Sequence, residues 1–322
     1  MSSPANRIEG WLYAPRGFWQ RFLLGVLTPL GWLLCAVGWR RLHPSTPPIT
    51  PPLPTISVGN LTVGGTGKTP LIAALAARYA KPAIILRGYR RKSRGCQLIA
   101  HERRLCATLV QSGDEAMLYH RLLPWATVIV SADRLEAIAY AHRLGATVAF
   151  LDDAFRHRHI EKLDLLIAPT PTPENRRCLP AGPYRLPPKA YQLADRVVQE
   201  GVDFTRRCTI VNPTEKMVLM TAIARPERLE PFLPDLQGRC YFPDHHPFTH
   251  QEASEALKRH QGTSLLVTEK DAVKLESFNL PLSYLTLTLE VGENLHQMVA
   301  DYTLQKGGDA TISPKNPDPL RT

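Results

Sequence analysis

Cysteine is scarce in the sequence, and no two cysteines form a C-x-x-C pair. The six that are present lie far apart along the chain, at Cys35, Cys96, Cys106, Cys178, Cys208 and Cys240. This distribution excludes a compact zinc-binding motif and a dense disulfide framework. We therefore expect reduced thiols and a globular fold that depends on its hydrophobic core, which a chain of 322 residues is long enough to form.

Acidic residues are also in short supply, 29 against 39 basic ones, so the net charge is +10. Such a charge favours an anionic partner, which nucleic acid, an anionic membrane or a phosphorylated substrate could supply. Aromatic residues make up only 7% of the chain, and no one element interleaves them with basic residues as nucleic-acid-binding surfaces do. We therefore expect no nucleic-acid partner, and nothing in the sequence indicates an obligate protein partner.

Charge is absent altogether from residues 22–39, a stretch that arginines flank on both sides. As one helix it would be about 27 Å long, slightly less than the hydrocarbon core of a bilayer. A secretory signal is disfavoured because no small-residue cleavage site follows, whereas Pro29 and Gly31 leave a buried core helix open. We favour a membrane anchor, which either spans the bilayer or lies in one leaflet of membrane lipid.

Residues 55–79 (TISVGNLTVGGTGKTPLIAALAARY) read as a strand, a glycine-rich loop and a helix. This order is that of a P-loop, whose backbone N–H groups and helix dipole bind phosphate. Thr62 replaces the first glycine of the strict pattern, so an ordinary glycine-rich turn is the alternative. We expect ATP to contact the loop at Thr62, Val63, Gly64, Gly65, Thr66, Gly67, Lys68 and Thr69.

Two groups complete the chemistry that a P-loop needs. Lys68 is expected to reach the terminal phosphates, and the Thr69 hydroxyl is expected to bind Mg²⁺. Asp152 and Asp153 end an apolar run at residues 147–151, and carboxylates at that end of a parallel strand lie at the same sheet edge as the P-loop. We therefore predict that both aspartates bind the metal, although a helix cap or solvated turn is the alternative for either one.

Apolar runs alternate with helical patterns through the middle of the chain, with strands expected at 83–86, 127–130, 147–151 and 165–168 and a helix at 133–144. This alternation predicts an α/β fold with a P-loop NTPase-like, doubly wound, mostly parallel sheet. The predicted divisions are an N-terminal hydrophobic, membrane-associating helix (1–42), a proline-rich linker (43–54), the P-loop core (55–212), a smaller C-terminal α/β lobe (213–306) and a flexible tail (307–322).

Further polar groups allow more than one interpretation. Asp114, after Gly113, could face the phosphates or cap a helix. His245, within Asp244-His245-His246, could deprotonate a hydroxyl, bind a metal or lie on the surface. His157 lies in the basic segment FRHRHIEK, and Arg87 begins the basic segment RGYRRKSR. Either residue could bind an anion or be solvated.

Taken in order, these segments resemble the tetraacyldisaccharide 4'-kinases, the membrane-associated lipid A kinases of Gram-negative bacteria. The resemblance covers nearly the whole chain: the hydrophobic helix, SVGNLTVGGTGKTP, ILRGYRR, GDEAML, DDAFRHRHIEKLDLLI, LPAGPYRLP, AIARPERL, FPDHHPFT and TEKDAVKL. It implies transfer of the ATP γ-phosphate to the 4'-hydroxyl of a lipid A precursor, a tetraacyl glucosamine disaccharide 1-phosphate. It also implies a location at the cytoplasmic face of the inner membrane.

The resemblance also implies roles for single residues. Asp114 and His245 would be the catalytic pair, Lys68 and Asp153 would act at the phosphates, and Asp152 would bind metal. His157, Arg87 and Arg185 would contact the substrate.

The chain departs from the family's DDGFQH and GPLREP patterns. Ala154 and Arg156 stand in the first, and Tyr184 and Leu186 stand in the second. The change to Ala154 suggests a shifted turn after Asp153. Leu186 replaces an acid and so removes any substrate contact which that acid makes. The alternative function is a membrane-associated P-loop ATPase of the partitioning or positioning type, which would hydrolyse ATP without phosphorylating a lipid.

Overall fold

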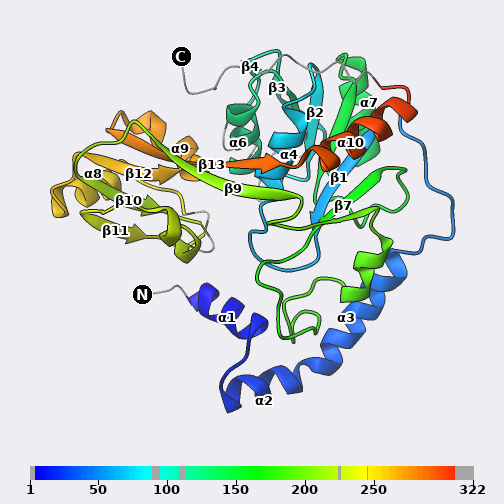
Figure 1. Ribbon diagram of the computed structural model, residues 1–322, viewed down its shortest axis with the longest axis horizontal. Coiled ribbons are helices and arrows are strands. Elements are labelled where there is room, and N and C mark those ends of the chain that lie inside the picture. Colours follow the sequence, from blue (N-terminus) through cyan, green and yellow to red (C-terminus); the bar gives the residue numbers. More distant parts are fainter. Residues whose placement is uncertain (1–3, 89–94, 109–112, 224–225, 245, 309–322) are drawn as a thin grey trace. The chain divides into compact units, whose positions relative to one another are not determined.

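The computed structural model describes residues 4–88, 95–108, 113–223, 226–244 and 246–308. The described chain divides into two compact units (Figure 1). The larger contains Arg7–Thr205 together with the segment that begins at Glu290, and the smaller is built mainly from Arg206–Leu289. Each unit has its own sheet and its own core.

The larger unit is built on an eight-stranded sheet with the order β4-β3-β5-β2-β6-β1-β7-β8. Six neighbouring strands, from β5 to β8, are parallel, and β3 and β4 add an antiparallel edge. The strands are β1 (Thr55–Asn60), β2 (Pro82–Leu86), β3 (Gln97–His101), β4 (Arg104–Leu105), β5 (Thr127–Val130), β6 (Val148–Asp152), β7 (Leu163–Ile167) and β8 (Arg196–Val198). The predicted α/β fold with a mostly parallel sheet is confirmed.

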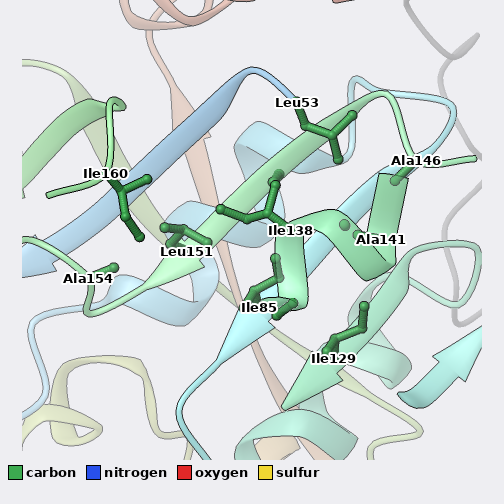
Figure 2. Close-up of a cluster of buried hydrophobic side chains, with 12 residues drawn as sticks. Leu53, Ile85, Ile129, Ile138, Ala141, Ala146, Leu151, Ala154 and Ile160 are labelled. Atoms are coloured by element: carbon green, nitrogen blue, oxygen red, sulfur yellow. The ribbon is translucent and has the colours of Figure 1, made fainter. Parts of the chain in front are cut away.

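Helices cover both faces of this sheet. Because successive strand residues point to opposite sides, neighbouring residues of one strand pack against different helices. Leu151 of β6 packs with Ile138 of α7 (Arg134–Arg143) in the buried cluster of Figure 2. The preceding residue, Phe150, contacts Tyr79 instead, with ring centroids 5.7 Å apart, at the end of the segment that follows α4 (Lys68–Ala76). The helix α6 (Asp114–Leu122) and the 3-10 helix η1 (Pro188–Leu193) complete the elements between the strands.

The last helix, α10 (Glu293–Gln305), belongs to the larger unit, whereas the predicted smaller lobe extended to residue 306. The reason lies in its buried face. Leu295 and Val299 are buried, and the Thr303 hydroxyl lies 3.2 Å from the Tyr79 hydroxyl. This apolar face turns toward the P-loop helix segment.

The N-terminal region forms three helices, not the one that the sequence suggested: α1 (Pro4–Tyr13), α2 (Phe18–Val26) and α3 (Thr28–Arg41). Among the described residues, no one helix has both the length and the apolar character to cross a bilayer, although α2 and α3 together do; a 51° bend separates them. Pro29 lies in the first turn of α3, where a missing N–H is tolerated.

One expectation about cysteine was wrong. Cys35 of α3 and Cys178 form a disulfide, with their Cα atoms 5.9 Å apart. Gly31, one turn earlier, lies so close to the same loop that a Cβ there would be 2.9 Å from the Cys178 carbonyl oxygen. Tight packing of α3 on this loop therefore brings together two thiols separated by 143 residues, which spacing along the chain does not reveal.

The smaller unit contains a five-stranded sheet with the order β11-β10-β12-β13-β9. Its strands are β9 (Phe204–Val211), β10 (Met217–Thr221), β11 (Gly238–Tyr241), β12 (Ser264–Thr268) and β13 (Leu282–Val291), with α8 (His250–Arg259), α9 (Glu269–Leu275) and the 3-10 helices η2 (Pro226–Arg228), η3 (Glu230–Phe232) and η4 (Glu276–Phe278). Ala253, Ala256, Ala272 and Leu275 from the two α-helices pack against β10 and β12. Four neighbouring strands run parallel: β11, β10, β12 and β13.

Candidate active site

The P-loop lies between β1 and α4, as predicted. Gly64 and Gly67 have φ angles of 93° and 91°, a conformation that residues with a Cβ adopt at a cost. Gly67 caps α4, so the helix begins at Lys68 and its N-terminal N–H groups are available to an anion. Glycine is therefore required where the loop turns into the helix.

Thr62, which replaces the glycine of the strict pattern, is held away from that turn. It is buried and pairs with Tyr184 in an isolated β-bridge, and the next N–H, of Val63, donates to the Pro183 carbonyl at 2.9 Å. The start of the loop, at Thr62 and Val63, is thus extended and pairs like a β-strand, a conformation that a residue with a side chain adopts without strain. The departure leaves the phosphate-binding turn intact.

Lys68 is held by a short relay of side-chain contacts. Its Nζ donates to Asn60 Oδ1 at 3.1 Å, and Asn60 Nδ2 donates to the Thr62 carbonyl at 2.7 Å. Asn60 is the last residue of β1 and is buried. The lysine is therefore anchored beside the loop by an amide, which carries no charge that would compete with phosphate.

Asp152, the last residue of β6, is buried and accepts a hydrogen bond from the Tyr119 hydroxyl at 3.0 Å. Burial raises the pKa of Asp152 to about 7; Lys68 opposes the shift, while Glu115 and Asp153 add to it. Burial also raises the pKa of Tyr119, whose hydroxyl hydrogen-bonds with Thr69 as well. A carboxyl of this kind loses its proton readily when a cation arrives.

Asp153, the next residue, has different partners from Asp152. Its φ is 54°, its N–H donates to the Val58 carbonyl at 3.0 Å, and its Oδ2 forms an ion pair with Arg185 Nη1 at 3.0 Å. The Arg185 N–H donates to the Leu61 carbonyl at 2.7 Å, which fixes that residue against the entry to the P-loop. The structure therefore joins the predicted metal-binding residue to a predicted substrate-binding residue.

Three of the four departures from the family patterns, Ala154, Tyr184 and Leu186, now have a structural explanation. Ala154 is fully buried in the cluster of Figure 2, and Leu186 is 2% exposed in a second apolar cluster with Phe155. Tyr184 lies in the same second cluster. These replacements fill the core beneath the loop and present no group to a substrate.

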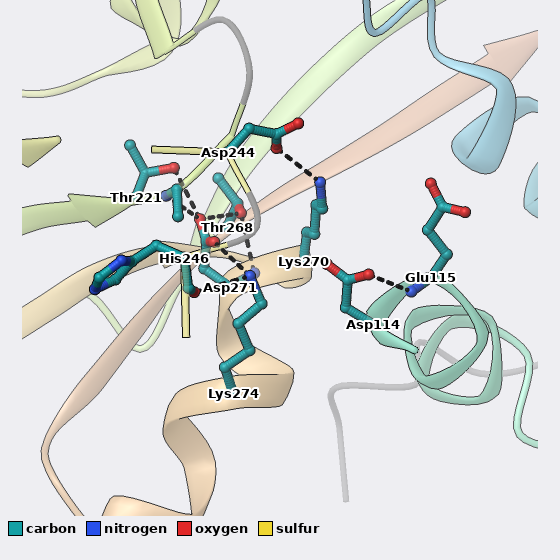
Figure 3. Close-up of polar contacts among 10 residues, drawn as sticks. Asp114, Glu115, Thr221, Asp244, His246, Thr268, Lys270, Asp271 and Lys274 are labelled. Carbon is teal, nitrogen blue, oxygen red and sulfur yellow. Dashed lines mark hydrogen bonds and ion pairs between the residues drawn. The ribbon is translucent and has the colours of Figure 1, made fainter. Parts of the chain in front are cut away.

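Asp114 begins α6 directly after Gly113, whose φ is 80°. Its Oδ1 accepts the Glu115 N–H at 3.1 Å (Figure 3). Glu115 and Tyr119 were not singled out as site residues, yet both act on Asp152. Their i, i+4 spacing on one helix face was the only signal available in the sequence.

His157 and Arg87 lie in the same unit as the P-loop. Burial lowers the pKa of His157 to about 4, with the charge of Arg134 as the next cause, so the imidazole is neutral at pH 7. Lys162 Nζ donates to the His157 carbonyl at 3.0 Å. Arg87 follows β2, is exposed, and its positive charge also acts on His157.

The segment around Asp244 and His246 lies in the smaller unit, and His245 itself lies outside the described residues. Asp244 Oδ1 accepts from Lys270 Nζ at 3.1 Å, and Lys274 Nζ donates to the His246 carbonyl at 3.3 Å (Figure 3). Both lysines belong to α9. The first turns of α9 therefore hold the residues on either side of the predicted catalytic histidine.

Between those lysines, Asp271 is fully buried. Its Oδ2 accepts from the Thr221 hydroxyl at 2.8 Å, the Thr268 hydroxyl at 2.8 Å and the Ala222 N–H at 3.2 Å. These donors stand at the ends of β10 and β12. Asp271 thus links the ends of β10 and β12 at the start of α9, the helix whose lysines bind the segment around Asp244 and His246.

The sheet is mostly parallel, a glycine loop leads from β1 into α4, and an aspartate ends the adjacent strand β6. These features define a P-loop nucleotide-binding protein of the α/β class. A sequence model of the family described as tetraacyldisaccharide-1-P 4'-kinase matches residues 23–304. The chain therefore belongs to the tetraacyldisaccharide 4'-kinase family, as the resemblance of its motifs indicated.

Individual relatives agree with this assignment. The tetraacyldisaccharide 4'-kinase of Aliarcobacter butzleri is 40% identical over 89% of this chain and 93% of its own length. That of Helicobacter pylori is 42% identical over 78% and 81%. The crystal structure of LpxK from Aquifex aeolicus in complex with ATP has a TM-score of 0.74 at 26% identity, covering 87% of this chain and 99% of that one.

Proposed function

We propose that this chain transfers the γ-phosphate of ATP to the 4'-hydroxyl of a tetraacyl disaccharide 1-phosphate, a precursor of lipid A. The observation that carries the proposal is the pairing of an intact P-loop with a buried acid on the adjacent strand: Lys68 acts electrostatically on Asp152. Phosphoryl transfer needs mainly positioning and charge stabilisation, which this arrangement supplies. The family and the ATP complex of the Aquifex aeolicus relative support it.

Magnesium fits the oxygen groups at this edge of the sheet. Thr69, Asp152 and Asp153 offer a hydroxyl and two carboxylates, and Mg²⁺ prefers a few such ligands completed by water and phosphate oxygens. Among the described residues, no group of three or more His, Cys, Asp or Glu side chains forms a metal site by itself. That is expected for a metal that arrives with the nucleotide, where it would neutralise charge on the phosphates.

The chain's own residues would then divide the work. Lys68 and the N-terminus of α4 would bind the β- and γ-phosphates. Asp114 and His245 would orient the acceptor hydroxyl and take its proton. Asp114 is suited to this by its place at the first position of α6, where it is partly exposed.

We also propose that α2 and α3 hold the enzyme at the cytoplasmic face of the inner membrane. Their large apolar side chains are exposed, among them Phe18 (74%), Trp19 (72%), Val26 (64%), Trp32 (69%) and Leu33 (61%). Exposed apolar residues in such number mark a surface that contacts lipid or another protein. Co-sedimentation with anionic vesicles tests this part of the proposal, and a chain that stays in the supernatant would contradict it.

The decisive experiment follows ³²P from γ-labelled ATP into a detergent-solubilised tetraacyl disaccharide 1-phosphate. We expect labelled lipid that depends on Mg²⁺ and is lost in Lys68→Ala, because the lysine and the metal both neutralise phosphate charge. Arg143→Gln, an exposed change at the end of α7, is the matched control for loss of a cation. ATP hydrolysis without labelled lipid would instead favour a membrane-associated P-loop ATPase.

A further inference from the structure

The Tyr119 hydroxyl lies between two groups at the edge of the sheet that carries the P-loop. It donates to Asp152 Oδ2 at 3.0 Å, and it also hydrogen-bonds with the Thr69 hydroxyl. Three elements meet at this one oxygen, because Thr69 comes from α4, Asp152 from β6 and Tyr119 from α6. The tyrosine is fully buried, where a phenol oxygen costs free energy unless it is hydrogen-bonded.

The direction of the two hydrogen bonds follows from the donors that a tyrosine has. A phenol hydroxyl carries a single hydrogen, and here that hydrogen is directed to the carboxylate of Asp152. The hydrogen bond with Thr69 must therefore run the other way, with the threonine hydroxyl as donor and the Tyr119 oxygen as acceptor. The result is a directed chain of hydrogen bonds from Thr69 to Tyr119 to Asp152.

This chain orients the oxygen atoms that a cation would bind. A threonine hydroxyl whose hydrogen points to Tyr119 directs its lone pairs away from the tyrosine, where a metal ion can accept them. The carboxylate of Asp152 uses one of its two oxygens for the tyrosine hydroxyl, so it can bind a cation through the other. Each side chain thus keeps an acceptor position for a metal.

The backbones of both partners are fixed by other contacts, so Tyr119 acts on their side-chain torsions. Thr69 is the second residue of α4. Asp152 pairs with Val58 of β1, and the buried Arg134 of α7 donates through Nη2 to the Asp152 carbonyl oxygen at 3.3 Å. Loss of the tyrosine hydroxyl would therefore leave the strand and the helix in place and release the two side chains.

We propose that Tyr119 is the positioning residue for the metal that accompanies ATP, and that it acts by holding the side chains of Thr69 and Asp152. This inference deepens the proposed function, and the identity of the metal as Mg²⁺ rests on that function. Tyr119 also stands on α6, the helix that begins with Asp114, the residue proposed to act on the acceptor hydroxyl. One side chain thus connects the helix that carries this acid with both metal-binding groups.

The first test separates metal binding from nucleotide binding and from turnover. Isothermal titration calorimetry measures the affinity for a non-hydrolysable ATP analogue, in Mg²⁺ and in EDTA, for the wild-type chain and for Tyr119→Phe, which lacks only the hydroxyl. In Mg²⁺ we expect the variant to bind about 10-fold more weakly, whereas in EDTA it should match the wild-type chain. An unchanged or increased affinity in Mg²⁺, or an equal loss in both media, would overturn the positioning role.

Tyr79→Phe is the matched control for this substitution. Tyr79 is 5% exposed in the same unit, and its hydroxyl lies 3.2 Å from the Thr303 hydroxyl. The change therefore also removes a buried hydroxyl, but its partner is not a metal-binding group, and we expect unchanged affinities in both media. Thermal denaturation shows that each variant is folded. A loss in Mg²⁺ equal to that of Tyr119→Phe would count against the proposal, because any lost buried hydroxyl would then weaken the site.

The second test asks whether Tyr119 acts through Asp152. In the transfer assay, Tyr119→Phe should raise the Mg²⁺ concentration for half-maximal rate about 10-fold, while the KM for the lipid acceptor is unchanged. In the Asp152→Asn background the same substitution should have a smaller effect, because the hydroxyl no longer has a carboxylate to hold. Effects on the Mg²⁺ requirement that are fully additive would contradict this route.

The calorimetry also distinguishes failure of this inference from failure of the proposed function. Suppose that Mg²⁺ strengthens binding of the analogue to the wild-type chain, that Tyr119→Phe loses this gain, and that no phosphate reaches the lipid. The proposed function would then fall and the positioning role would stand. A chain that phosphorylates the lipid, and in which Tyr119→Phe keeps the full gain from Mg²⁺, would give the reverse result.

Discussion

Asp152 of the larger unit and Asp271 of the smaller one are both buried, at the carboxyl end of a parallel strand or just beyond it, and the two have different surroundings. Asp152 ends β6 in the larger unit, and Asp271 follows β12 by three residues in the smaller one. Burial raises the pKa of both carboxyls. Their hydrogen bonds differ: Asp152 accepts one from Tyr119, whereas a single oxygen of Asp271 accepts three.

The difference separates a reactive acid from a structural one. The donors around Asp271 replace the water that the carboxylate loses on burial, so its charge is stabilised by the fold itself. Asp152 has fewer donors and depends on Lys68, and its pKa of about 7 shows that its charge is incompletely compensated. A buried acid left in that state is suited to receiving a cation.

Asp152→Asn gives the largest expected effect. The amide keeps the shape but loses the charge, so phosphate transfer should fall by about 100-fold or more, while thermal stability is unchanged or rises slightly because a costly buried charge is removed. Steady-state kinetics and thermal denaturation measure the two quantities, with the exposed Asp301→Asn as control. A variant that unfolds but turns over normally when folded would reverse the roles assigned to the two aspartates.

Asp271→Ala should show the opposite pattern. The Thr221 and Thr268 hydroxyls and the Ala222 N–H would lose their acceptor inside the smaller unit, at a cost of about 3 kcal/mol in the free energy of unfolding. Denaturant titration measures that cost, and Asp235→Ala, an exposed change in the same unit, should cost less than about 0.5 kcal/mol. A loss of activity with no loss of stability would mean that Asp271 takes part in the chemistry.

The fold of the larger unit could be predicted because its signals are local. Apolar runs at 83–86, 127–130 and 147–151 correspond to β2, β5 and β6, and the glycines of the P-loop mark its turn. The edge strands β3, β4 and β8 are short or partly exposed and carry no such pattern. The long strand β13 alternates between buried and partly exposed positions.

The site could be predicted only in part, for a related reason. Lys68, Thr69 and the two aspartates at the end of β6 belong to patterns a few residues long. Tyr119 depends instead on α6 packing against the P-loop edge, and the contact of Arg156 with Arg185 joins residues 29 apart. Such contacts follow from tertiary packing, which a single sequence does not display.

The pH dependence of stability gives the smallest and most specific test of the comparison. Asp152 has a pKa of about 7 in the folded chain, against 3.8 for the ordinary side chain, so between these values only the folded state holds the proton. Its contribution to the free energy of unfolding therefore falls as pH rises, by roughly 1.4 kcal/mol per unit. His157, with its pKa lowered to about 4 from 6.5, contributes the opposite slope, because there only the unfolded state is protonated.

Burial lowers the pKa of His296 to about 4 as well, so its slope adds to that of His157 in the wild-type chain between about pH 4.5 and 6, and the share of Asp152 must be measured as a difference. In Asp152→Asn the negative slope of Asp152 is lost while the positive slopes of His157 and His296 remain, so the free energy of unfolding should rise with pH about 1.4 kcal/mol per unit more steeply than in the wild-type chain. Asp271→Asn serves as the comparison, since its carboxyl is stabilised by three hydrogen bonds and should change the slope less. Parallel pH profiles for Asp152→Asn and the wild-type chain would show that Asp152 is charged throughout this range, and would remove the physical difference between the two aspartates.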